Sequence, residues 1–108
     1  DIDAFERAVL DEIGMPPEIA PRHRIPHFQH IIGGYAAGYY SYLWSEVMDA
    51  DAFAAFEEAG NIFDRKTANK LKTHIYAAGS KRDALESYVA FRGRPPEIDG
   101  LLRKRGLG

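Results

Sequence analysis

Tyrosines are concentrated in one short stretch of the chain, next to a histidine and a glycine pair. Four tyrosines fall between positions 35 and 42, and His30 and Gly33-Gly34 come just before them. On a helix, Tyr35, Tyr39 and Tyr42 would share one face, because they are spaced by four and then three residues. Neutral phenol donors suit two tasks: stabilising negative charge that develops on a carbonyl oxygen, and holding the backbone of an extended peptide.

The residues alone leave a plainer interpretation open, in which these tyrosines form a packing face with hydrated hydroxyl groups. The gaps between them are filled by small residues: Ala36, Ala37, Gly38 and Ser41. Small side chains let either a second helix or a ligand approach closely. The glycine pair gives the preceding turn unusual backbone freedom. The pattern therefore indicates a candidate site without deciding what occupies it.

Three histidines raise the question of a metal site. His23, His27 and His30 recur at spacings of four and three, which superficially suits ligands on one helix. Pro26 interrupts the run, however, and Arg24 follows His23. A zincin helix needs His-Glu-x-x-His with the glutamate as general base, and this chain has no such motif. We therefore expect no metal site among these residues.

The stretch from Phe28 to Glu46 resembles a segment of the thimet oligopeptidase and peptidyl-dipeptidase family. In that family the segment lies downstream of the zinc site. It reads Phe-x-His, a glycine pair, then Tyr-x-Ala-x-Tyr-Tyr-x-Tyr-x-Trp. Similar flanking segments begin at Asp49 and Phe91, so the resemblance covers essentially the whole chain. In character it is nearest to the bacterial peptidyl-dipeptidases.

The resemblance implies a function and a set of site residues. Residues 1–108 would be the C-terminal helical segment of a zincin-like catalytic domain, with the zinc motif upstream. Tyr35 and Tyr42 would be catalytic and stabilise the oxyanion, and the substrate-binding residues would be His30, Gly33, Gly34 and Tyr39. The intact parent would bind zinc and hydrolyse short peptides. The 108-residue piece would bind no cofactor and be inactive alone.

Helical periodicity dominates the chain, and it predicts an all-α, orthogonal bundle of five or six helices. In the parent, this bundle would form part of one wall of a deep channel. The expected helices cover residues 2–13, a short stretch around 28–32, 35–48, 51–59, a stretch opened by Asp64 or Thr67, a stretch capped by Ser80 with Asp83, and a last one holding Ile98. Glycines 14, 60, 79 and 93 are expected to end helices.

Several other side chains have expected roles. The large aromatic residues should be core or interface anchors: Trp44, Phe53, Phe56, Phe63 and Phe91. Arg92 and Arg94 would either grip a peptide carboxylate or bond helix-end carbonyls. Glu46 is expected to be solvated or satisfied by a partner.

Composition narrows the class of protein. The net charge of −2 gives no electrostatic case for nucleic acid or an anionic membrane surface, and no apolar run approaches the ~20 residues of a membrane span. The absence of cysteine fits a reducing compartment, so we expect a cytoplasmic location. The start at Asp1, without methionine, indicates a chain cut from something longer.

A different class of function remains open from the sequence. The chain could be a free-standing helical module that binds or self-associates without catalysis. The missing zinc motif favours this alternative. So does the apolar surface that a detached channel wall would expose, and that surface would promote self-association. For the peptidase, the partners would instead be short peptides and the rest of the catalytic domain.

Overall fold

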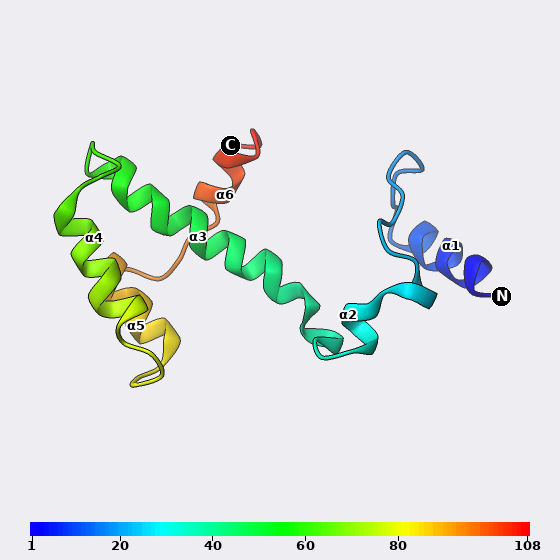
Figure 1. Cartoon of the computed structure of the whole chain (residues 1–108). Coiled ribbons are helices and arrows are strands. Elements are labelled where there is room, and N and C mark those ends of the chain that lie inside the picture. Colours follow the sequence, from blue (N-terminus) through cyan, green and yellow to red (C-terminus); the bar gives the residue numbers. More distant parts are fainter. The chain divides into compact units, whose positions relative to one another are not determined.

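The computed structural model describes all 108 residues, and its regular structure is entirely helical (Figure 1). The six α-helices are α1 (Ile2–Glu12), α2 (Gln29–Ile32), α3 (Ser41–Glu58), α4 (Arg65–Leu71), α5 (Ala84–Arg92) and α6 (Asp99–Lys104). Two 3-10 turns, η1 (Ile25–His27) and η2 (Ala36–Tyr40), and one π-helical turn, η3 (Lys72–Tyr76), join them. The all-α prediction is confirmed. No helix combines the length and apolar character needed to cross a bilayer.

The chain divides into two compact units, Asp1–Tyr39 and Tyr40–Gly108. In the first unit, α1 begins because the Asp1 carboxylate accepts a hydrogen bond from the backbone N–H of Ala4 at 3.0 Å. Beyond its end, Gly14 takes the expected left-handed conformation at φ 69°. Arg24 then ties the proline-rich connection back to α1. Its Nε lies 2.8 Å from Glu6, and it also pairs with Asp3.

The second unit holds all the buried side chains. Val47 and Ala50 of α3 pack against Leu101 of α6, and Tyr88 and Phe91 of α5 are 2% and 3% exposed. The helix α3 is continuous, so the predicted break between residues 48 and 51 is wrong. No glycine or proline interrupts it. Asp51, which could have started a new helix, is instead buried at 1% exposure and bonded to other parts of the unit.

The residues that cap α4 and α5 agree with the predicted caps except at one position. Asp64 caps α4, and its carboxylate accepts from the N–H of Thr67 at 2.7 Å. The predicted Ser80 cap is wrong, because Asp83 lies directly before α5 and accepts from the N–H of Leu85 at 2.8 Å. The left-handed Gly93, at φ 86°, ends α5 as expected.

Large apolar side chains remain exposed in both units. On α1, four side chains that share one face are 40–68% exposed: Ile2, Phe5, Val9 and Ile13. In the second unit Trp44, Phe53 and Phe63 are 58%, 51% and 81% exposed. The core interpretation of these three aromatics is therefore wrong for this chain, whereas it is confirmed for Phe91. Their role as interface anchors stays a prediction.

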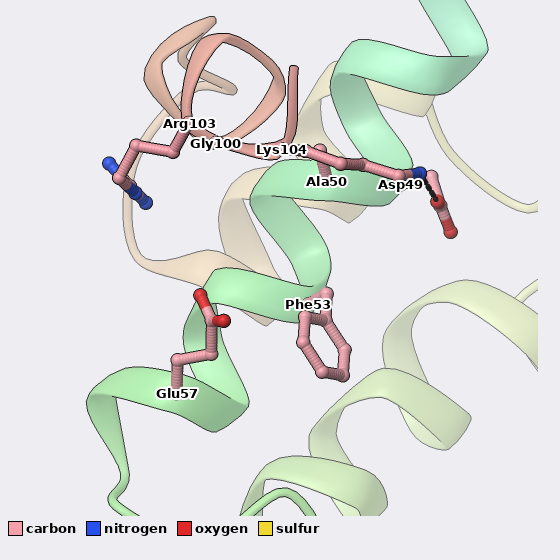
Figure 2. A pocket seen from close by; sticks show the side chains of 7 residues that line it. All are labelled: Asp49, Ala50, Phe53, Glu57, Gly100, Arg103 and Lys104. Carbon is pink, nitrogen blue, oxygen red and sulfur yellow. Dashed lines mark ion pairs between the residues drawn. The ribbon is translucent and has the colours of Figure 1, made fainter. Parts of the chain in front are cut away.

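The contact between α3 and α6 depends on one glycine (Figure 2). A Cβ at Gly100 would lie 3.0 Å from the carbonyl carbon and oxygen of Ala50. Gly100→Ala should therefore lower the free energy of unfolding by about 1–2 kcal/mol, although alanine itself favours helix. Urea unfolding of the 108-residue chain measures this change. Gly38→Ala, where the new Cβ meets nothing within 4 Å, is the control. A Gly100→Ala chain as stable as the wild type would contradict the close approach.

Candidate functional site

Three of the predicted site residues come together in the first unit. The ring of His30 lies 5.5 Å from that of Tyr35 and 5.3 Å from that of Tyr39, measured between centroids. Phe28 supports this group. Its ring meets Tyr39 edge-on at 4.7 Å and stacks on His23 at 5.0 Å. The result is an aromatic cluster, defined by His23, Phe28, His30, Tyr35 and Tyr39.

The backbone between His30 and Tyr35 folds back on itself. The N–H of Tyr35 donates to the carbonyl oxygen of His30 at 3.2 Å, and that of Gly33 donates to Gln29 at 2.7 Å. A Cβ on Gly33 would lie only 3.0 Å from the same Gln29 oxygen, so a larger residue would push this turn apart. Gly34 has open space where a Cβ would be. The glycine pair thus permits the tight turn that brings Tyr35 beside His30.

The predicted single helix from residue 35 to 48 is wrong. Ala36 adopts a left-handed φ of 45°, which α-helices of L-residues exclude, so Tyr35 lies outside any helix. Tyr39 lies in η2, and the α-helix starts only at Ser41. The three tyrosines therefore do not form a stripe on one helix. The turn and its ring contacts, not helical spacing, position Tyr35 and Tyr39.

Tyr42 belongs to the second unit, in the first turn of α3. Its side chain is 50% exposed, and that of Tyr35 in the first unit is 49% exposed. Each of the two tyrosines is thus half-exposed within its own unit. Tyr40 is more exposed, at 71%.

The histidines do not form a ligand set for a metal. His23 and His30 both pack against the Phe28 ring. No three His, Asp or Glu side chains in the chain gather closely enough to hold a metal ion. Histidine nitrogens are zinc ligands, but these side chains are not arranged as a zinc site needs.

The second unit contains a charge network that the sequence analysis did not anticipate. Buried Asp51 accepts a hydrogen bond from the Tyr88 hydroxyl at 2.6 Å and pairs with Arg94 at 2.7 Å. The Nε of Arg92 lies 3.4 Å from the same carboxylate, and its Nη1 donates to Glu58 at 2.7 Å. In the sequence, Asp51 lies between two small apolar residues, and this pattern could have indicated a buried carboxylate. A buried carboxylate needs partners of this kind.

These contacts decide between the two interpretations of the arginines. Arg92 and Arg94 hold carboxylates of their own unit, so their role is structural. The partners are mainly side chains rather than the expected helix-end carbonyls, although Arg94 also donates to the carbonyl oxygen of Pro95 at 2.9 Å. Burial by itself would raise the pKa of Asp51, but the bonds from Tyr88 and Arg94 and the nearby guanidinium charges hold that pKa below its usual value. The network therefore keeps Asp51 ionised.

Comparison with known proteins places the chain in a family. Residues 2–107 match the profile of peptidase family M3, so the chain belongs to this family. The resemblance drawn from Phe28 to Glu46 is thereby confirmed.

Three relatives illustrate the sequence identity and the share of each chain that is aligned. The chain is 50% identical over 86 residues to oligopeptidase A of Haemophilus influenzae, covering 78% of this chain and 12% of that protein. The identity is 49% over 111 residues with the chloroplastic and mitochondrial oligopeptidase A of Arabidopsis thaliana, covering 97% of this chain and 14% of the relative. With the dipeptidyl carboxypeptidase of Escherichia coli it is 39% over 109 residues, covering 99% and 16%. The chain thus spans a small fraction of the length of these relatives.

Proposed function

We propose that this chain is the substrate-binding and transition-state-stabilising portion of a zinc metallopeptidase that hydrolyses short peptides. Its membership of peptidase family M3 carries the proposal. The aromatic cluster supports it, because this cluster gathers a histidine and two tyrosines beside a tight diglycine turn. The names of the relatives, oligopeptidase A and dipeptidyl carboxypeptidase, support peptides as the substrate class.

The site residues divide into two roles in this proposal. Tyr35 and Tyr42 donate hydrogen bonds to the oxyanion or to the adjacent peptide backbone, which suits their half-exposed phenol groups. His30, Tyr39 and the Gly33-Gly34 turn contact the bound peptide. A phenol serves here because its O–H group donates a hydrogen bond.

Zinc belongs to the parent enzyme in this proposal, held by residues outside this chain. When bound, it would supply a polarised scissile carbonyl and an activated water molecule. The part of this chain in the proposal is to bind and orient the peptide and to stabilise developing charge.

The isolated 108-residue chain should therefore show no peptidase activity when zinc is added. A quenched-fluorescent peptide measures cleavage, with the full-length parent, active and inhibited by a chelator, as the positive control. Zinc-dependent cleavage by the chain alone would contradict this division of roles.

The exposed apolar side chains support a further part of the proposal. The α1 face and the aromatic residues Trp44, Phe53 and Phe63 would pack against the rest of the catalytic domain. Without that domain, the same surface would promote self-association of the chain, as the alternative function assumed. A cytoplasmic location for the parent accords with the absence of cysteine.

A further inference from the structure

Positive charge is concentrated in one segment of the second unit. Residues 65–82 contain six basic side chains and no acidic one: Arg65, Lys66, Lys70, Lys72, Lys81 and Arg82. Since the chain has 14 basic residues, eight are left for the remainder, which carries all 16 acidic residues. A chain that is slightly acidic overall thus presents one strongly cationic segment.

None of these six cations forms an ion pair within the chain. All are exposed, and no carboxylate lies within ion-pair distance of any of them. The two carboxylates that flank the segment, Asp64 and Asp83, accept hydrogen bonds from backbone N–H groups as helix caps. The C-terminal basic residues differ in this respect, because Lys104 pairs with Asp49 and Arg105 with Glu46.

Helix stability does not explain the arrangement. Arg65 and Lys66 lie in the first turn of α4, where the helix dipole favours negative charge. Lys66 and Lys70 are one turn apart, and such like-charged pairs destabilise a helix. Arg65 and Lys66 therefore interact unfavourably with the dipole of the helix that carries them.

A shallow, open groove lies on this surface. It has a volume of about 520 Å³ and is lined by Arg65, Lys66, Asn69, Lys70, Thr73 and His74. One turn of helix separates Lys66 from Lys70 by about 6 Å, and alternate residues of an extended peptide are about 6.6 Å apart. The side chains at alternate positions of such a peptide are thus spaced about as far apart along its backbone as the two lysines are along their helix. Asn69 and Thr73 offer an amide and a hydroxyl to its backbone.

We infer that this groove and the cations around it, which we name the cationic groove, dock acidic peptide substrates. The inference rests on the proposed peptidase function. A short acidic peptide suits the groove better than a long polyanion. At physiological ionic strength the cations act over only about 8 Å, and the rest of the chain is acidic.

The test uses the full-length enzyme and two peptides that differ only by Glu→Gln at two alternate positions. In Lys66→Gln/Lys70→Gln, KM for the acidic peptide should rise about 3- to 10-fold while kcat stays unchanged, because surface charges attract substrate without touching the reacting atoms. The KM for the neutral peptide should not change. High salt should remove the preference of the wild type for the acidic peptide.

Arg103→Gln/Lys104→Gln is the matched control, since it removes the same charge from another exposed part of the unit. Equal KM increases in both variants would show a general charge effect and overturn the docking role. An unchanged KM in Lys66→Gln/Lys70→Gln, with both peptides still cleaved, would overturn it while the peptidase function stands. If the wild type cleaves neither peptide, the proposed function itself fails and the docking role falls with it.

Discussion

Replacing Tyr42 by phenylalanine in the full-length enzyme should lower kcat by about 100- to 1000-fold and leave KM nearly unchanged. The substitution removes a single hydroxyl group and keeps the ring. A donor that bonds the oxyanion acts mainly in the transition state, so its loss appears in turnover rather than in substrate binding. Steady-state kinetics on a peptide of fixed sequence measures both constants.

Tyr40→Phe is the matched control for this substitution. It makes the same chemical change two residues earlier, at a phenol that is 71% exposed and has no proposed role. Its kcat should stay within about twofold of the wild type. A Tyr42→Phe enzyme with wild-type turnover would remove Tyr42 from the catalytic residues.

The second large effect concerns stability. Asp51→Asn should lower the free energy of unfolding by about 3 kcal/mol, because it leaves Arg92 and Arg94 without their shared buried carboxylate. Denaturant unfolding of the 108-residue chain measures the loss. Glu58→Gln, which removes an exposed partner of Arg92, should cost less than about 1 kcal/mol. An equal loss of unfolding free energy in the two variants would mean that the burial of Asp51 does not add to the strength of its ion pairs.

The same network predicts a dependence on pH. The folded-state pKa of Asp51 is lower than that of an ordinary aspartate, so its stabilising contribution is complete above the unfolded-state pKa of about 4. That contribution is lost as the pH falls through the folded-state value. The wild type should therefore lose stability below about pH 4 more steeply than Asp51→Asn does. Parallel pH profiles of the two chains would contradict the lowered pKa.

Local signals predicted much of the fold. Glycines in left-handed conformations follow α1, α3 and α5 where expected, because only glycine adopts that conformation without strain. Asp64 caps a helix as expected, since its carboxylate lies within three residues of the N–H that it accepts from. These features depend on neighbouring residues, which are visible in a single sequence.

Features that depend on distant partners were not predictable in the same way. Asp51 resembled a helix start, but partners 37 to 43 residues away in sequence bury it inside α3. In the candidate site, helical spacing predicted a stripe of tyrosines on one helix. The left-handed conformation of Ala36 instead breaks the helical repeat between Tyr35 and Tyr39. Phe28 was expected only as part of a motif. Its place at the centre of the aromatic cluster follows from the turn that brings residues 23 to 39 together.

The absence of any buried side chain from residues 1–39 has a consequence for biosynthesis. Translation delivers this part of the chain before residues 40–108, yet it has no core with which to fold as it leaves the ribosome. Its helix and aromatic cluster therefore gain little stability from burial within this chain. The exposed, proline-rich connection between residues 15 and 26 is therefore an expected site of early proteolysis.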